Sequence, residues 1–339
     1  MDEIRWGMIG CGDVAERKSG PAFNLLPHSS LVAVAATSTE RAENYARRHG
    51  IPKWYGDGSL VIDDPDVNAV YIATPPDSHA SFTIRAAQAG KPVYVEKPMA
   101  RTFAECQAMI AACRQSGVPL FVAYYRRCLP AFSKIKELIE SEAIGAVRCI
   151  TIRLFSPPHP QDLDRDHLPW RVRPEKSGGG YLYDLASHQL DFLDYVFGPV
   201  SSAAGQTANQ AGLYPAEDMV AASWAHTSGV IGSGTWCFTA APGQAVEEAE
   251  IVGSRGRIGF SFFDQGPVRL ETSEGVEEFV FSRNDPIQLP LIQLVIDDLR
   301  GAGVCPSTGI SAARTNWVLE KIVNQSISQS VNSQSASRE

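Results

Sequence analysis

A run of strand length leads directly into a glycine-rich turn near the start of the chain. The strand is Ile4–Ile9, and the next six residues, Gly10–Ala15, follow the pattern G-x-G-x-x-A. Gly10 allows a tight turn, Gly12 lets a phosphate approach the backbone, and the small Ala15 allows a helix to pack close to the sheet. The pattern is a variant of the dinucleotide fingerprint, in which phosphates bind at the positive end of that helix. Taken alone, it also fits an ordinary strand-to-helix turn.

The first 126 residues alternate short apolar runs with helical segments. The expected strands are residues 31–36, 69–73, 93–95 and 119–123, and the expected helices are residues 39–49, 78–89 and 102–116. This alternation predicts parallel βαβ units, and therefore an α/β domain with a doubly wound parallel sheet over residues 1–126. Such a sheet is the setting that a dinucleotide-binding glycine loop requires, so the alternation favours that interpretation.

The pattern changes near residue 127. Longer strands with alternating polarity and turns rich in Gly and Ser predict an antiparallel α+β domain over residues 127–325, with helices near 130–142, 286–301 and 310–326. Apolar residues alternate along its strands, namely Ile150, Ile152, Leu154, Val220, Trp224 and Trp236. We expect one sheet face to cover the domain's own helices and the other, too apolar for water, to be covered by a partner subunit. The tail 326–339 is rich in Ser, Gln and Asn and is expected to be disordered.

Charge and cysteine content limit the classes of partner. The net charge of −8 argues against a nucleic-acid or membrane-surface partner, and no secretory signal or membrane-spanning run is visible. The seven cysteines form no C-x-x-C pair, so neither a disulfide framework nor a structural zinc site is expected, and no metal is predicted. This cysteine use is typical of a cytoplasmic protein.

Two further segments carry candidate chemistry. Glu96-Lys97-Pro98 follows a buried strand and so lies at the same sheet edge as the glycine loop, where ligands of open α/β sheets bind. In the expected helix 181–196, Asp184 and His188 are four residues apart, as in a tuned acid/base pair. A surface lysine in a loop, and a capped helix with a core histidine, are the alternatives.

Taken together, these segments resemble the Gfo/Idh/MocA oxidoreductases, named after glucose-fructose oxidoreductase and inositol dehydrogenase. The matching pieces are Gly10–Ala15, Ala73-Thr74-Pro75-Pro76 with His79, Glu96-Lys97-Pro98 and Gly178–Asp191. The resemblance implies a Rossmann domain joined to a large, mostly antiparallel open sheet whose outer face commonly forms the interface of a homodimer or homotetramer. It implies cofactor contacts from Gly10, Gly12, Asp13, Val14, Thr74, Pro75, His79, Glu96 and Lys97.

The resemblance also implies a catalytic group of Lys97, Asp184 and His188. His188 would exchange the proton of a substrate hydroxyl, Lys97 would stabilise the reacting oxygen, and Asp184 would position the substrate and tune His188. The implied activity is hydride transfer between a nicotinamide cofactor and a sugar, sugar derivative or polyol-like substrate. A non-catalytic ligand-sensing regulator and an NAD-dependent glycosidase on the same scaffold are the alternatives.

Cofactor choice follows from the end of the second strand. Thr37 occupies the position at which NAD-preferring sites usually carry an acid, while Ser38 and Arg41 suit a 2′-phosphate. We therefore expect NADP(H) to be preferred, with NAD(H) possible if Glu40 takes the ribose instead.

Substrate contacts are expected from Tyr125, Trp170, Arg171 and Tyr181. Tyr125-Arg126-Arg127 stands where many members have Asn-Arg-Arg, and Trp170-Arg171 resembles the 1,5-anhydrofructose reductase branch. Gln189 and Asp191 look more like the sugar and inositol branches. The substrate therefore stays open at this point.

Overall fold

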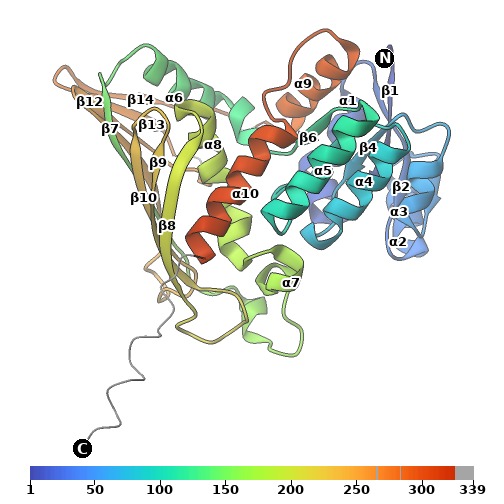
Figure 1. Cartoon of the computed structure of the whole chain (residues 1–339), viewed down its shortest axis with the longest axis horizontal. Helices are drawn as coiled ribbons and strands as arrows, with labels where there is room; N and C mark the ends of the chain where they lie inside the picture. Colours follow the sequence, from blue (N-terminus) through green and yellow to red (C-terminus); the bar gives the residue numbers. More distant parts are fainter. Residues whose placement is uncertain (265, 283, 325–339) are drawn as a thin grey trace, which may run out of the picture.

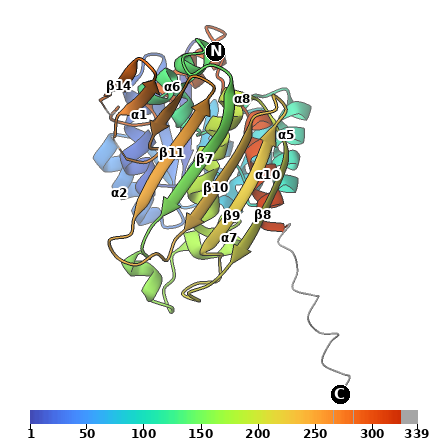
Figure 2. The ribbon, with the colours of Figure 1, turned by 90° about the vertical axis from the view of Figure 1, so that its left-hand side faces the viewer.

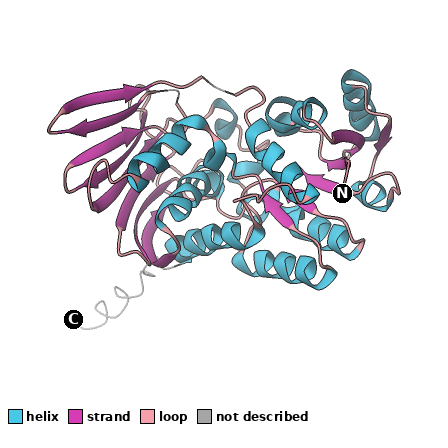
Figure 3. Ribbon diagram, turned by 90° about the horizontal axis from the view of Figure 1, so that it is seen from above, coloured by secondary structure: helices cyan, strands magenta, loops and turns pink. Residues whose placement is uncertain are grey.

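The chain folds around two separate sheets, one of six strands and one of eight (Figure 1). The computed structural model describes residues 1–264, 266–282 and 284–324. The tail 326–339, expected to be disordered, lies outside these residues. Figure 3 shows the larger sheet at one end of the molecule, the smaller sheet toward the other end, and helices between them.

The smaller sheet is parallel throughout and has the strand order β3-β2-β1-β4-β5-β6. Its strands are β1 (Ile4–Ile9), β2 (Ser29–Ala35), β3 (Lys53–Tyr55), β4 (Ala69–Ile72), β5 (Val93–Val95) and β6 (Leu120–Val122). Strands β4, β5 and β6 are buried along their whole length, as expected when helices cover both faces of a parallel sheet. The predicted doubly wound Rossmann domain is confirmed.

Helices cover both faces of this sheet. One face packs against α1 (Gly20–Leu25), α2 (Thr39–His49) and α9 (Leu289–Arg300), and the other against α3 (Gly58–Asp63), α4 (His79–Gln88) and α5 (Phe103–Ser116).

Local signals set the helix ends: the Ser38 hydroxyl accepts a hydrogen bond from the Arg41 amide, and Gly50 ends α2 with φ +66°. Helix α9 belongs by sequence to the segment 127–325, yet it packs on the first sheet.

The larger sheet has the order β14-β13-β12-β11-β7-β10-β9-β8, in which only the β7–β10 pair is parallel. Its strands are β7 (Val147–Phe155), β8 (Val200–Ala208), β9 (Met219–His226), β10 (Ile231–Cys237), β11 (Val246–Gly253), β12 (Gly256–Phe260), β13 (Val268–Thr272) and β14 (Gly275–Phe279). The predicted α+β domain with a mostly antiparallel open sheet is confirmed. The Ser, Ala and Gly residues of β8 carry little hydrophobic alternation, so the sequence pattern indicates this strand only weakly.

The two faces of the larger sheet differ from the sequence-based expectation. Ile150, Ile152, Leu154, Val220, Trp224 and Trp236 are all buried in one core on the helix-covered face. The opposite face is turned toward the viewer in Figure 2, and it exposes Thr151, Arg153, Ser223 and Ile231. The expectation of an outer face too apolar for water was therefore wrong, because a period of two places all six apolar residues on the same side.

The remaining helices and helical turns are distributed along the whole chain. They are α6 (Pro130–Glu140), α7 (Pro174–Ser177), α8 (Ser187–Phe197) and α10 (Gly309–Asn324), together with the short turns η1 (Ala15–Ser19), η2 (Pro76–Ser78), η3 (Tyr125–Cys128), η4 (Pro160–Leu163), η5 (Trp170–Val172) and η6 (Leu182–Ala186). Helix α10 contacts β8 and α8 on one side and α5 on the other, and so joins the domains (Figure 1). Within the ranges described above, no helix has the length and apolar character needed to cross a bilayer.

Candidate active site

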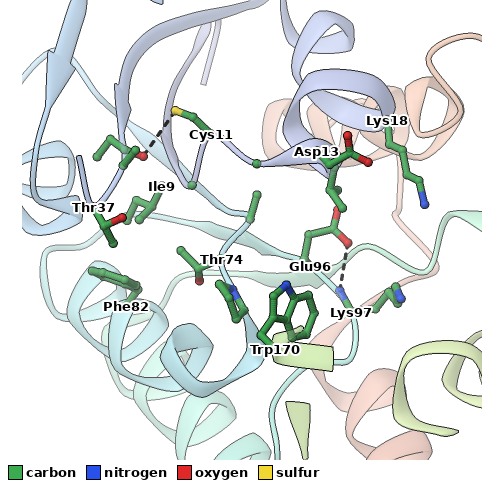
Figure 4. A pocket seen from close by; sticks show the side chains of 18 of the residues that line it. Ile9, Cys11, Asp13, Lys18, Thr37, Thr74, Phe82, Glu96, Lys97 and Trp170 are labelled. Atoms are coloured by element: carbon green, nitrogen blue, oxygen red, sulfur yellow. Dashed lines mark hydrogen bonds between the residues drawn. The ribbon is translucent and has the colours of Figure 1, made fainter. Parts of the chain in front are cut away.

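A cavity of about 610 Å³ lies at the carboxyl ends of the parallel strands (Figure 4). Its walls come from the loops after β1, β2, β4 and β5, and from η5 and η6 of the second domain. Ligands of open α/β sheets bind at this edge. The glycine loop and Lys97, which are far apart in sequence, therefore face the same space.

The glycine loop has the geometry that a bound phosphate requires. Gly10 has φ +107°, and an added Cβ would lie 2.6 Å from the carbonyl oxygen of Ala73. A Cβ on Gly12 would meet nothing within 4 Å, so the backbone there borders open space. Asp13 and Val14 complete this wall, and the buried Ala15 packs beneath it. The loop thus fits the phosphates of a dinucleotide.

The residues predicted to select the cofactor lie at the end of the cavity next to the carboxyl end of β2. Thr37 and Arg41 line the cavity, and Arg41 forms no ion pair with any residue that the structure describes. Ser38, Glu40 and Arg41 also border an adjoining surface hollow. The Ser38 hydroxyl is engaged in capping α2, where it lies 3.3 Å from the Arg41 amide nitrogen.

The three predicted cofactor residues Thr74, Pro75 and His79 differ in their position relative to the cavity. Thr74 and Pro75 line the cavity, whereas His79 is fully buried and is not among the wall residues. The His79 ring nitrogens lie 2.8 Å from the Thr74 carbonyl oxygen and 3.1 Å from that of Pro98. His79 thus connects the loops after β4 and β5, and burial lowers its pKa.

Glu96 lines the cavity, and buried side chains hold its carboxylate by hydrogen bonds. Its Oε1 accepts hydrogen bonds from the Tyr71 hydroxyl at 2.8 Å and from the Gln288 amide at 2.6 Å. Gln288 comes from the segment before α9, 192 residues further along the chain. Nothing in the sequence around Gln288 points to this contact.

Lys97, Asp184 and Arg171 form one charged cluster across the two domains. The Lys97 ammonium lies 2.5 Å from Oδ1 of Asp184, and Nε of Arg171 lies 3.2 Å from Oδ2. The Lys97 and Asp184 side chains are 12% and 19% exposed, so water screens their interaction weakly. Burial alone raises the pKa of Asp184, but the charges of Lys97 and Arg171 outweigh it and lower this pKa to about 2.

His188 and Asp184 do not pair with each other among the residues described, although the spacing suggested an acid/base pair. Asp184 belongs to η6, a π-helical turn, and His188 lies at the start of α8, the next helix. No hydrogen bond joins Asp184 to His188 within the described ranges. The His188 ring instead packs edge-on against Tyr125, with ring centroids 5.1 Å apart, and is absent from the cavity wall.

Burial keeps His188 uncharged. The side chain is 4% exposed, and its Nδ1 has no hydrogen-bond partner among the residues described. Desolvation, with added effects of Arg126 and Lys97, lowers the pKa of His188 well below its usual range. A neutral imidazole can accept a proton, which suits it to act as a base.

The predicted substrate residues divide into two groups. Tyr125, Trp170 and Arg171 line the cavity, and the Arg171 guanidinium stacks on Trp170 at 4.7 Å. Tyr181 does not line it; its hydroxyl donates to the buried Asp162 at 2.8 Å. Among the wall residues that were not predicted from the sequence are Lys18, Arg126, Phe263 and Gln288. Among the residues described, no group of three His, Cys, Asp or Glu side chains could hold a metal ion.

Comparison with known proteins gives the family of the chain. Residues 4–124 match the oxidoreductase family with an NAD-binding Rossmann fold, and residues 132–259 match the GFO/IDH/MocA C-terminal domain. The chain is 37% identical to Oxidoreductase P35 of Formosa agariphila, over 94% of this chain and 97% of that protein.

The chain belongs to the Gfo/Idh/MocA oxidoreductase family.

Further relatives extend this finding. The chain is 32% identical to a 1,5-anhydro-D-fructose reductase of Ensifer adhaerens over 80% of each protein. A levoglucosan dehydrogenase, solved with NADH and levoglucosan, has the same fold, with a TM-score of 0.82 and 24% identity over 95% of this chain and 97% of that one. This Gfo/Idh/MocA protein is accordingly an NAD(P)-dependent oxidoreductase acting on CH–OH groups.

Proposed function

We propose that the protein oxidises a CH–OH group of a sugar, sugar derivative or polyol-like substrate, or reduces the corresponding carbonyl. The observation that carries the proposal is the Lys97–Asp184–Arg171 cluster, which stands at the end of the cavity that begins at the glycine loop. A positioned ammonium group beside a nucleotide cavity stabilises negative charge that develops on a substrate oxygen. The relationship to an anhydrofructose reductase supports a carbohydrate substrate.

Hydride transfer to or from the substrate carbon is the chemistry that a nicotinamide would supply when bound in this cavity. In the oxidative direction the C–H bond of the substrate breaks, the O–H proton leaves, and a carbonyl forms. The Lys97 ammonium donates a hydrogen bond to the reacting oxygen. Asp184 holds that ammonium in place and, with Arg171, positions the neighbouring hydroxyl groups.

His188 is the first candidate to accept the proton in this proposal: its ring is neutral at ordinary pH and packs against Tyr125, although His188 itself does not line the cavity. Tyr125 is the second candidate, since its ring contacts His188 and it lines the cavity. Burial raises the pKa of the Tyr125 phenol, but the charges of Arg126, Lys18 and Lys97 outweigh it and lower this pKa below the usual value.

The cofactor in this proposal is NADP(H), with NAD(H) as the alternative. The Gly10–Val14 loop would hold the pyrophosphate, and Thr37, Ser38 and Arg41 would meet the adenosine ribose. Arg41 has no carboxylate partner within the described ranges and lies at the cavity edge, which favours a 2′-phosphate.

Assembly and compartment are part of the same proposal. The outer face of the larger sheet carries small exposed side chains, such as Ala221 and Ser223, and we expect a second copy to cover it in a homodimer or homotetramer. The seven cysteines are unpaired, which suits the reducing cytoplasm.

The test is to incubate the protein with a panel of carbohydrates and each nicotinamide cofactor. Turnover is measured through the absorbance of the reduced cofactor. Net reduction or oxidation of the cofactor supports the proposal. Two outcomes would favour the alternatives: glycoside cleavage without net cofactor change indicates a glycosidase, and ligand binding without any turnover indicates a regulator.

A further inference from the structure

Arg126 is a buried cation without a counter-charge. The residue is only 6% exposed, and its Nε donates a hydrogen bond to the Phe262 carbonyl oxygen at 2.9 Å. Its Nη1 has no hydrogen-bond partner, and no carboxylate lies within ion-pairing distance, among the residues that the structure describes. The guanidinium lies over the Phe263 ring at 4.5 Å. Its neighbour Arg127, by contrast, is paired with Asp191 through two hydrogen bonds.

Lys18 is the second unpaired cation at this place. It projects from the π-helical turn η1, is half-buried, and forms no ion pair within the described ranges. Figure 4 shows its side chain directed toward the end of the cavity that holds Lys97. Its charge acts on Tyr125, Asp184 and His188.

Lys18 and Arg126 mark the junction of two cavities. Both line the main cavity and an adjoining one of about 240 Å³, whose other walls are mostly aromatic or aliphatic, including Phe132, Phe260 and Phe262. A substrate whose reacting carbon lies beside Lys97 can therefore extend toward Lys18 and Arg126.

The charges at this end of the main cavity do not balance. Four cations, Lys18, Lys97, Arg126 and Arg171, line it together with the carboxylates Glu96 and Asp184. The exposed Asp13, which lies near Lys18 in Figure 4, pairs with Arg17. Glu96 is engaged by Tyr71 and Gln288, and Asp184 by Lys97 and Arg171. The exposed Asp264 borders the adjoining cavity without pairing with either unpaired cation. Burying a guanidinium without a partner costs free energy, which a bound anion would offset.

We propose that the substrate is an anionic sugar, and that its carboxylate or ester oxyanion binds between Arg126 and Lys18. This inference rests on the proposed function and adds the class of sugar to it. The anionic group takes no part in the redox step; its pairing with the two cations orients the hydroxyl that reacts beside Lys97. A carboxylate and a phosphate monoester share this chemistry, so the test separates them.

The test compares matched charged and neutral sugars. Kinetics are measured for glucuronate against glucose, galacturonate against galactose, and mannuronate against mannose, with glucose 6-phosphate as the ester. We expect kcat/KM of the wild type to favour one charged form over its neutral counterpart by about 10- to 150-fold, the value of a charge-assisted hydrogen bond. Preference for the uronate identifies a carboxylate, and preference for the phosphate identifies an ester.

Variants of Arg126 and Lys18, which lie on separate elements, test whether these two residues cause the preference for a charged sugar. Arg126→Gln and Lys18→Met should each lose most of the charged-over-neutral preference, while Arg126→Lys retains part of it. A merely structural role of Arg126 would reduce activity toward charged and neutral sugars alike. Should Arg126→Gln fail to fold, Lys18→Met still tests the site, since its side chain is half-buried and unpaired. Arg269→Gln, an exposed change on β13, is the control and should keep the preference.

The possible failures are distinguishable. Turnover of neutral sugars at least as fast as all the charged ones overturns this inference and leaves the proposed function standing. Variants that weaken cofactor binding without changing the preference for charged sugars also overturn this inference, because the cations would then bind the dinucleotide. If no sugar is turned over, the proposed function fails. The same charged and neutral sugars are then titrated into the protein with NADPH or NADH, which tests the anion site alone. Equal binding of charged and neutral sugars, or no binding, overturns the anion site.

Discussion

The Lys97 ammonium lies 2.5 Å from the Asp184 carboxylate and 2.9 Å from the carbonyl oxygen of the same residue. The two side chains come from different domains, so this contact fixes a cation at the boundary between the nucleotide-binding sheet and the second domain. An ammonium held by two acceptors keeps one donor available. That remaining donor is what the proposed chemistry requires.

Replacing Lys97 tests this role. Lys97→Met should lower kcat by about 10²- to 10⁴-fold, the range for a positioned catalytic group, while cofactor affinity stays nearly unchanged. Steady-state kinetics and cofactor titration measure the two effects separately. Lys136→Met, a change on the surface of α6, is the matched control and should behave as the wild type. A Lys97→Met enzyme with kcat near the wild-type value would contradict the assignment.

The pH dependence of oxidation tests His188. A base must be neutral to accept a proton, and the pKa of His188 is lowered well below its usual range, so the ring stays neutral at pH values at which an ordinary histidine is charged. We therefore expect kcat/KM for oxidation to remain level as pH falls to about 6.5 and to decline only below it. A decline that begins above this value would argue against His188.

The variants His188→Asn and Tyr125→Phe identify the proton acceptor. If His188 accepts the proton, His188→Asn should lose about 10²- to 10⁴-fold in kcat and Tyr125→Phe much less. The reverse order would assign the proton to the Tyr125 phenol.

The nucleotide-binding end of the cavity gives a prediction on cofactor choice. Arg41→Ala should weaken NADP(H) binding by about 10- to 150-fold and NAD(H) binding little, because only the former has a 2′-phosphate for the guanidinium. Titration of both cofactors into the wild type and the variant measures this. Equal affinities in the wild type, or a parallel loss for both cofactors, would speak for Glu40 at the ribose instead.

The buried pair of Arg127 and Asp191 gives a prediction on stability. Its two hydrogen bonds measure 2.7 and 2.6 Å, and the side chains are 2% and 1% exposed. Arg127→Met leaves the Asp191 carboxylate buried and unpaired, so we expect a loss of about 3–5 kcal/mol in the free energy of unfolding. Denaturant unfolding measures this loss. Arg85→Met breaks the exposed pair with Asp63 on the nucleotide-binding domain and should cost at most about 1 kcal/mol; equal losses would contradict this expectation.

The assembly prediction can be tested in solution. Light scattering should give a multiple of the monomer mass, and Ser223→Arg on the outer sheet face should lower it, because a charged side chain would be placed in the interface. A concentration-independent monomer in the wild type would refute the oligomer.

The sequence predicted the parts of the fold that depend on local patterns. The strand, turn and helix around Gly10 are local, and so is the alternation that placed Lys97 at the sheet edge. The contact between Lys97 and Asp184 joins residues 87 apart, and that of Glu96 with Gln288 joins residues 192 apart, so no periodicity could reveal either. The resemblance to known oxidoreductases supplied the first pair and not the second.

Two features of the site escaped prediction for a different reason. The four-residue spacing of Asp184 and His188 does not reveal that Lys97 and Arg171, from other segments, engage the Asp184 carboxylate. Arg126 and Arg127 are adjacent in sequence, yet Arg127 is paired and Arg126 is not, among the residues described. Whether an arginine has a carboxylate partner depends on its neighbours in space, which the sequence does not show. Burial and pairing become known only once the chain is folded.

The most direct test of the central claim follows the reduced nicotinamide during turnover of neutral and charged sugars by the purified protein. The account predicts one equivalent of reduced cofactor for each substrate molecule oxidised, and loss of this signal in Lys97→Met. Cleavage of a glycoside with no net change in the reduced cofactor, or saturable sugar binding with no turnover, would contradict it.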